Sequence, residues 1–300
     1  MRAVILNSFR GIDGLELSEV PDPAPAEGEQ LVRVRAASIG PWDLANAVGA
    51  FVPAGGSNEF PQVQGWDFAG ETADGRRVMG FVPQPWMGVG ALAEQIAVPA
   101  GILAPMPDAL QFTEASALPV CALTAGLLVD AAAVGGGDVV LVTGAAGMVG
   151  GFVVQIATSL GAHVAAAVRP GDAEEAGQLG AEMTVDTGGD LDGAVRGDWP
   201  EGVDACIDTV GLAPDGLACV RDDGAFVTSV PTAIPDGARG IAPQTVQVQP
   251  DADALAGLAE RAAAGELTVR IAEVLPLDRF RDAYTRLERG GLRGKIVLTP

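Results

Sequence analysis

The sequence predicts an α/β protein in which a β-rich part is followed by alternating strands and helices. Up to about residue 100, short apolar or alternating runs are separated by Gly- and Pro-containing turns, which is typical of a small β domain. From residue 113 onward, apolar strand-like runs alternate with helical runs, which is typical of a doubly wound parallel sheet. The length of 300 residues is consistent with two domains.

The β-rich part alternates most clearly at 31–36, where the even-numbered Val32, Val34 and Ala36 share one face of the predicted strand. Strands are predicted in this part at 3–6, 15–20, 31–36, 76–82 and 94–98. The second part is predicted to contain helices at 113–118, 123–132, 148–160 and 173–179, and strands at 139–143, 163–168, 183–185, 203–208, 225–230 and 246–249. A further helix, with Asp251 or Asp253 as its N-cap, should end at Gly265. The tail is predicted to form a strand at 269–275, a helix at 277–287 and a last strand at 296–299.

The segment 138–161 has the pattern strand, glycine turn, helix. A β-branched run ends at Thr143, and Gly144, Gly147 and Gly150 then precede a helical run that ends at Gly161. Glycines at such a turn allow the backbone to approach a pyrophosphate, which would bind to free N–H groups at the helix N-terminus. The segment therefore predicts a dinucleotide site. The alternative is a tight helix–sheet turn without a ligand.

Composition excludes several classes of protein. The net charge of −21 argues against nucleic acid or an anionic membrane as a partner, because both require a basic surface. Lys295 is the only lysine, so an anionic ligand would depend on arginines and backbone amides. Neither a signal peptide nor a membrane-spanning run is recognisable, and we expect a cytoplasmic protein. The cysteines have no zinc or redox spacing, and Cys121 and Cys206 are expected to be small buried residues.

Several short segments form a recognisable series, at 37–43, 61–70, 90–94, 117–119, 123–125, 135–150, 155–157, 208–211 and 294–298. In this order and spacing, the chain resembles the zinc-independent quinone oxidoreductases of the medium-chain dehydrogenase/reductase superfamily over nearly its whole length. The resemblance implies a GroES-like catalytic domain, formed by 1–118 together with 266–300, and an inserted Rossmann domain at 119–265. It also implies an active cleft between these domains and a homodimer that pairs edge strands near 225–230.

The resemblance further implies that no catalytic metal is bound. Gly40 lies where zinc-dependent relatives have their first ligand Cys, and Trp66 replaces a ligand His. The only histidine, His163, is predicted at the entry of a strand far from the cleft. The chain also departs from its family: Asn is usual at position 40, and the loop at 71–75 is short, so we expect a more open rim.

The predicted cofactor is NADPH. In NAD-binding Rossmann folds an acidic residue follows the second strand, but here Arg169 stands 19 positions after Gly150. A guanidinium could pair with a 2′-phosphate, which a carboxylate would repel. The acidic neighbours Asp172, Glu174 and Glu175 argue against this role. The alternative is that Arg169 is a solvated loop charge.

The resemblance implies further contacts with the cofactor. Thr124 would lie near the nicotinamide, although it could instead bond to its own helix. Lys295 would either contact the cofactor or merely cover a strand. The residues expected to line the pyrophosphate turn or to border the nicotinamide half are Ala146, Met148, Val149, Val210, Gly211, Ser229 and Val230.

For the acceptor, Trp42, Phe51, Trp66 and Phe68 form either an aromatic wall for a flat molecule or part of a core. No Ser-His-Asp, Cys-His or paired-carboxylate arrangement is evident, and Asp43 and Asp67 are expected to hydrogen-bond to neighbouring backbone. The leading hypothesis is therefore an NADPH-dependent, metal-free reductase of quinones.

One alternative is a reductase of carbon–carbon double bonds in enones or enoyl thioesters. Relatives of that kind often supply a tyrosine as proton donor, whereas Tyr284 is the only tyrosine here and is expected at the surface or an interface. The other alternative is a non-catalytic NADPH-binding sensor or structural protein.

Overall fold

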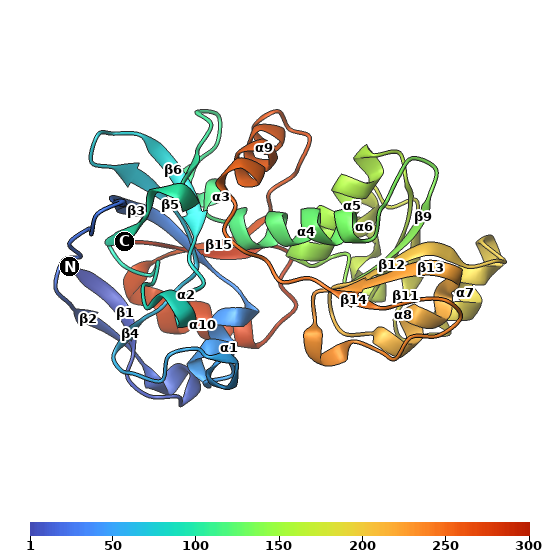
Figure 1. The fold of residues 1–300 in the computed structure, drawn as a ribbon, viewed down its shortest axis with the longest axis horizontal. Coiled ribbons are helices and arrows are strands. Elements are labelled where there is room, and N and C mark those ends of the chain that lie inside the picture. The colour runs from blue at the N-terminus through green and yellow to red at the C-terminus, as the bar shows by residue number, and fades with distance from the viewer. The chain divides into compact units, whose positions relative to one another are not determined.

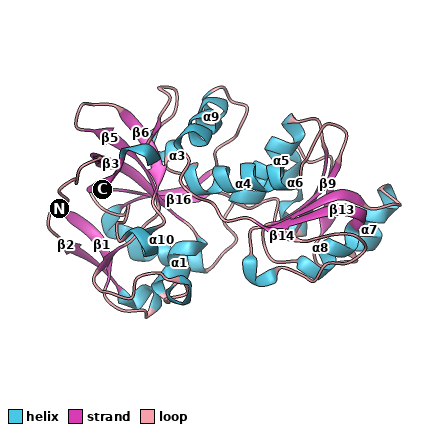
Figure 2. Cartoon of the chain, in the orientation of Figure 1, coloured by secondary structure: helices cyan, strands magenta, loops and turns pink.

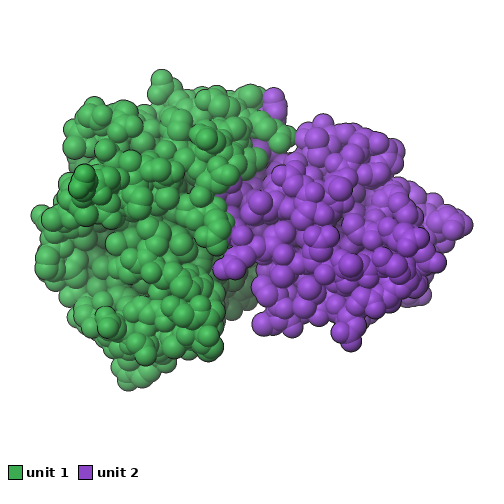
Figure 3. All heavy atoms as spheres, viewed as in Figure 1, with its two compact units in different colours: residues 1–120, 249–265, 269–300 green, residues 121–248, 266–268 purple.

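A computed structural model describes residues 1–300, and the chain divides into two compact units (Figure 3). Unit 1 comprises Met1–Val120, Gln249–Gly265 and Val269–Pro300. Unit 2 comprises Cys121–Val248 and Glu266–Thr268. The domain boundaries suggested by the sequence, at 118/119 and 265/266, remain a prediction.

Unit 1 is built on two β-sheets, most of whose strands are labelled in Figure 1. The larger sheet has the strand order β15-β16-β3-β5-β6-β8, with β7 also paired to β3, and the smaller has the order β2-β1-β4. The strands are β1 (Arg2–Leu6), β2 (Leu15–Glu19), β3 (Glu29–Ile39), β4 (Gln62–Val63), β5 (Asp67–Thr72), β6 (Arg77–Phe81), β7 (Gln95–Pro99), β8 (Ala104–Pro105), β15 (Ile271–Pro276) and β16 (Lys295–Thr299).

The alternation predicted for 31–36 is confirmed in β3. Val32, Val34 and Ala36 are buried, whereas Arg33 and Arg35 are exposed. The buried face of β3 joins a hydrophobic core that also receives side chains from the C-terminal strand and helix. The C-terminal tail is therefore part of the same unit as the N-terminal strands.

Short helices join or cover these strands (Figure 2). They are α1 (Pro41–Ala47), α2 (Gln84–Met87), α3 (Phe112–Ala115), α9 (Ala252–Ala263) and α10 (Phe280–Glu288), with 3-10 turns η1 (Gly11–Gly14), η2 (Val52–Ala54), η3 (Ala100–Ile102) and η6 (Leu277–Arg279). Asp251 caps α9 as predicted, because its carboxylate accepts a hydrogen bond from the Ala254 amide at 2.9 Å.

Unit 2 is a parallel sheet with the strand order β11-β10-β9-β12-β13-β14, which is the order 3-2-1-4-5-6 of a dinucleotide-binding Rossmann fold. Its strands are β9 (Val139–Thr143), β10 (His163–Val168), β11 (Met183–Asp186), β12 (Val203–Asp208), β13 (Val220–Thr228) and β14 (Gln244–Thr245). The remaining elements are α4 (Pro119–Ala131), which begins in unit 1, α5 (Met148–Ser159), α6 (Ala173–Gln178), α7 (Leu191–Asp198), α8 (Ala213–Cys219), η4 (Pro170–Asp172) and η5 (Pro231–Ala233). Cys121 and Cys206 are buried, as predicted.

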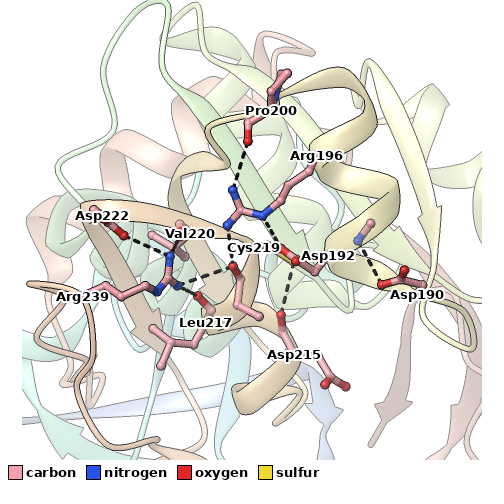
Figure 4. Close-up of polar contacts among 12 residues, drawn as sticks. Asp190, Asp192, Arg196, Pro200, Asp215, Leu217, Cys219, Val220, Asp222 and Arg239 are labelled. Carbon is pink, nitrogen blue, oxygen red and sulfur yellow. Dashed lines mark hydrogen bonds and ion pairs between the residues drawn. The ribbon is translucent and has the colours of Figure 1, made fainter.

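Two arginines hold the C-terminal end of α8 (Figure 4). Arg239 donates to the carbonyl oxygens of Leu217 at 2.7 Å and Val220 at 2.6 Å, and Arg196 donates to that of Ala218 at 2.9 Å. Cations are favourable there because the last carbonyls of a helix are unpaired and carry partial negative charge. Arg239 thereby holds the segment after β13 against the sheet.

The strand predicted at 246–249 is wrong. The strand in this region, β14, is Gln244–Thr245, and it pairs in parallel with Val227–Thr228 at the end of β13. A longer β14 has no partner because β13 ends at Thr228. The segment proposed for edge pairing between protomers is therefore covered in part by β14 of the same chain. No helix in the structure has the length and apolar character needed to cross a bilayer.

Candidate active site

The glycine turn between β9 and α5 is closely packed. Gly144 has a φ of +65°, in the left-handed region that favours glycine, and a Cβ there would lie 2.4 Å from Val210 Cγ1. At Gly150 a Cβ would lie 2.3 Å from the Gly144 carbonyl oxygen. Glycine at 150 thus lets the start of α5 approach the turn. Gly147 is the N-cap residue of α5, and its amide donates to the Gly144 oxygen at 2.8 Å.

The other residues predicted for the pyrophosphate lie on the same turn. Met148 is the first residue of α5 and Val149 the second, and both are partly exposed. Ala146 is buried. The turn therefore brings together all the residues that the sequence assigned to it, at the carboxyl end of β9, where dinucleotides bind in this fold.

Arg169 directly follows β10, where the sequence placed it. Its side chain is about two-thirds exposed, but its Nε and Nη2 atoms lie 2.9 Å and 2.8 Å from Oδ2 of the buried Asp172. The guanidinium is thus exposed to solvent and at the same time paired with a carboxylate, and its role toward a 2′-phosphate stays a prediction. Its Asp172 contact holds it at the strand end.

Asp208, at the end of β12, is a site residue that the sequence reasoning missed. Its Oδ1 accepts hydrogen bonds from the amides of Val210 at 3.2 Å, Gly211 at 3.0 Å and Leu212 at 3.1 Å. The hydroxyls of Thr143 and Thr228 also donate to this fully buried carboxylate. Asp208 thus fixes the loop carrying Val210 and Gly211 relative to β9 and β13. A carboxylate directly before a Thr-Val-Gly turn was the available signal.

Apart from Lys295, which belongs to unit 1, the remaining cofactor candidates lie in unit 2. Thr124 is buried on α4. The amides of Ser229 and Val230 donate to the Asp208 carbonyl oxygen at 3.1 Å and the Thr228 hydroxyl at 3.0 Å. Val210 is 55% exposed, although its amide is bonded to Asp208. His163 begins β10 and its exposed ring contacts Glu182, as expected for a polar strand entry.

In unit 1, aromatic rings gather around Trp66. The centroid of the Trp66 ring lies 6.2 Å from that of Trp42, 5.7 Å from that of Phe51 and 6.1 Å from that of Trp86. The Phe81 ring stacks on Trp66, with a centroid distance of 6.5 Å and an interplanar angle of 4°. We call these five residues the aromatic cluster. The sequence predicted Trp42, Phe51 and Trp66, but it missed Trp86, which comes from α2.

A buried amide network links the segments that carry the aromatic cluster. The Asn46 side chain donates to Gln64 Oε1 at 2.9 Å and to Gln84 Oε1 at 2.7 Å. Asn46 lies on α1, and the two glutamines each stand two residues before a tryptophan of the cluster. This network fixes α1, α2 and the segment before β5 to one another.

Phe68 is fully buried in the core of unit 1, which is one of the two roles expected for it. It takes part in none of the ring contacts that define the aromatic cluster. Tyr284 is also fully buried, and its expected surface position is wrong. Phe280, Ala283 and Tyr284 form the buried face of α10 at helical spacing, and this periodicity places the tyrosine in the core.

Lys295 is buried and forms an ion pair with Asp67, with Nζ 3.0 Å from Oδ2. Its Nζ also lies 4.2 Å from the centroid of the Trp42 ring. Lys295 is thus not a surface residue that merely covers its strand. Asp67 and Asp43 accept hydrogen bonds from neighbouring backbone, as predicted. The amide of Val120 donates to Asp67 at 2.8 Å, and the amide of Gly40 donates to Asp43 at 2.7 Å.

Burial dominates the protonation of Asp43. Its loss of hydration raises the pKa of the carboxyl to about 7, although the Gly40 amide and the Lys295 charge act in the opposite direction. Burial also raises the pKa of the Tyr284 hydroxyl well above its usual value, and the neighbouring Asp43 adds to this effect. Tyr284 therefore remains a neutral phenol.

The donor set does not fit a catalytic zinc ion. No group of three or more His, Cys, Asp or Glu side chains in residues 1–300 is arranged to hold a metal. Gly40 and Trp66 stand at the positions that the alignment of motifs assigns to zinc ligands, and neither glycine nor tryptophan has a side chain that ligates zinc.

Comparison with known proteins gives consistent results. A family model described as a zinc-binding dehydrogenase matches residues 179–298. The chain is 29% identical in sequence to the 2-methylene-furan-3-one reductase of Solanum lycopersicum, in an alignment that covers 100% of this chain and 79% of the relative. It is 27% identical to the NADPH-dependent alkenal/one oxidoreductase of Arabidopsis thaliana, in an alignment that covers 100% of this chain and 80% of the relative.

A solved structure matches over its full length. The quinone oxidoreductase from Thermus thermophilus, also determined in complex with NADPH, is 30% identical to this chain and superimposes with a TM-score of 0.84, covering 100% of both chains. The fold is thus the combination of a GroES-like part and a Rossmann part. This chain belongs to the quinone oxidoreductases of the medium-chain dehydrogenase/reductase superfamily.

Proposed function

We propose that this protein is an NADPH-dependent, metal-free oxidoreductase that reduces quinones. When bound, NADPH supplies a hydride, and the quinone, after taking up one proton from solvent, becomes a hydroquinone while NADP+ is released. The protein holds the two reactants and excludes water. The observation that carries the proposal is the aromatic cluster, which contains Trp66 in place of a metal ligand.

On the cofactor side, the glycine turn and the N-terminus of α5 would hold the pyrophosphate. The left-handed Gly144 and the close approach at Gly150 are the features that such a cradle requires. Arg169 would hold the 2′-phosphate, exchanging part of its contact with Asp172 for the stronger charge of the phosphate. Val210, Gly211, Ser229 and Val230 would border the nicotinamide, on the loop and strand end that Asp208 fixes.

The acceptor side favours a flat, conjugated molecule. Indole and phenyl rings bind such molecules by stacking and by edge-to-face contact. Trp86 is 40% exposed and Trp66 is almost buried, so the aromatic cluster extends from the core of unit 1 to its surface. The links through Asn46 pre-organise the cluster before a ligand binds.

Reduction of an enone double bond is the second candidate function. It is favoured by the two plant relatives, whose names specify a methylene-furanone and alkenals or alkenones. Reduction of an enone requires protonation of carbon, which is slow without a positioned acid, whereas the oxygens of a reduced quinone take protons rapidly from water. Tyr284 is fully buried with a raised pKa, so it does not fit as that acid. This contrast favours the quinone.

The test is NADPH oxidation by the purified protein with a benzoquinone and an α,β-unsaturated ketone in parallel. Quinone turnover that exceeds enone turnover supports the proposal. Enone turnover alone would move the assignment to double-bond reduction. NADPH binding without either turnover would contradict both and favour a binding protein.

A homodimer and a cytoplasmic location are also proposals. Because β14 covers the end of β13, a dimer that pairs edge strands of this sheet would use β14. A light-scattering mass of one chain, 30.3 kDa, would refute the dimer. Fluorescent tagging and fractionation would test the location.

A further inference from the structure

The buried polar atoms that lack a hydrogen-bond partner within the protein are concentrated in one part of unit 1. They are Trp42 Nε1, Asp43 Oδ1, Gln62 Oε1, Trp66 Nε1, Gln84 Nε2 and Tyr284 Oη. Buried polar groups normally have partners, so such a concentration marks a place that requires explanation. Two of these atoms are indole nitrogens of the aromatic cluster, and an indole nitrogen can only donate. These two indole N–H groups therefore suit a ligand that accepts hydrogen bonds.

Trp42 occupies the space that a side chain at position 40 would fill. A Cβ built on Gly40 would lie 2.5 Å from Cζ2, 2.6 Å from Cη2 and 2.7 Å from Cε2 of the Trp42 ring. Gly40 has φ −142° and ψ 177°, which any residue can adopt. Glycine is thus required at 40 by the ring and not by the backbone.

The position of the donor follows from this contact. Nε1 is covalently bonded to Cε2, one of the three ring atoms over Gly40, so the N–H group lies beside the space of the absent side chain. On the ring itself, the Lys295 ammonium lies 4.2 Å from the centroid. A cation over an indole withdraws electron density from the ring and makes its N–H a stronger donor.

We propose that Trp42 recognises the oxygen atom of the acceptor, with its indole N–H donating a hydrogen bond to a quinone or enone carbonyl. The inference rests on the proposed function and specifies a residue for it. Trp42 as a whole is partly exposed, whereas its Nε1 has no contact with solvent. The carbonyl therefore reaches the donor only when the ring shifts, and the bond then forms away from water, where it is stronger.

Trp42→Phe is the first test, because phenylalanine keeps an aromatic ring at position 42 but has no hydrogen-bond donor. We expect kcat/KM for a benzoquinone to fall about tenfold, as for the loss of one hydrogen bond, with the KM for NADPH unchanged. The matched control is Trp199→Phe, a tryptophan that packs against the core of unit 2, which should leave both values unchanged. A Trp42→Phe enzyme with wild-type kcat/KM overturns the inference.

A second set of variants separates the donor from the packing. Gly40→Asn alone should lower quinone turnover because the new side chain and the Trp42 ring cannot share the same space. In Gly40→Asn/Trp42→Ala the carboxamide refills the space with an N–H donor, whereas Gly40→Leu/Trp42→Ala refills it without one. We expect several-fold higher kcat/KM in the Asn pair than in the Leu pair at similar melting temperature. Equal values in the two pairs would refute the role of the donor.

These outcomes distinguish the inference from the function on which it rests. If the wild-type protein reduces neither quinone nor enone, the proposed function fails and the inference fails with it. If the wild-type protein reduces the quinone but the Trp42→Phe and double variants show no difference, only the inference fails.

Discussion

Replacing Asp43 with Asn should change how stability depends on pH. Burial raises the pKa of Asp43 from 3.8 to about 7 in the folded protein. At a pH between these two pKa values, Asp43 is protonated in the folded protein but ionised in the unfolded chain. The neutral carboxyl therefore contributes its full stabilisation below about pH 4. This stabilisation is lost as the pH rises through about 7. At about 1.4 kcal/mol for each pKa unit, the loss is on the order of 4 kcal/mol.

The carboxamide of the Asp43→Asn variant would not titrate, and its oxygen can still accept the hydrogen bond from the Gly40 amide. The assay is urea unfolding of wild type and Asp43→Asn at pH 5, 6, 7 and 8. The free energy of unfolding of the variant minus that of the wild type should rise by a few kcal/mol across this range. Asp108→Asn is the control, because the Asp108 side chain is fully exposed. Parallel pH profiles for wild type and Asp43→Asn would refute the reasoning.

Three further substitutions test the cofactor side and the buried ion pair. Arg169→Ala should raise the KM for NADPH about tenfold, because a charge-assisted contact with the 2′-phosphate is lost, and should leave the KM for NADH nearly unchanged. Equal effects on both cofactors would exclude the 2′-phosphate role. Asp208→Ala should lower the free energy of unfolding by about 3 kcal/mol and raise the KM for NADPH, because three backbone amides lose their acceptor. An unchanged KM would show that Asp208 contributes to folding and not to cofactor binding. Lys295→Met should destabilise by about 3–5 kcal/mol by leaving Asp67 buried without its cation, and Lys295→Met/Asp67→Leu should recover most of this loss in urea unfolding. If the double variant is no more stable than Lys295→Met, the isolated charge is not the cause.

Local sequence patterns were sufficient for most of the fold. The strand, glycine turn and helix of 138–161 are present because β-branched residues, glycines at fixed positions and a C-terminal glycine determine structure within a few residues. The alternation predicted in β3 is confirmed for the same reason, because it depends on neighbouring residues alone. The strand expected at 246–249 failed because its pattern is local, whereas pairing depends on where β13 ends.

The parts of the site that sequence reasoning missed depend on contacts between distant residues. Lys295 and Asp67 are separated by 228 positions, and no spacing rule connects them. Trp86 joins the aromatic cluster because the amide of Asn46 ties α2 to α1. The pairing of Arg169 with Asp172 is the local exception, because the two residues are three positions apart. In the sequence alone, Asp172 was only an argument against the phosphate role of Arg169, and its burial depends on the fold.

The central claim is that hydride transfer from NADPH to a quinone proceeds here without a metal ion. The most direct measurement is quinone-dependent NADPH oxidation by protein that has been dialysed against a strong chelator, with its zinc content determined on the same sample. We predict full activity at a zinc content far below one ion per chain, with no increase on adding zinc. Activity that disappears with the chelator and returns with zinc would contradict the account.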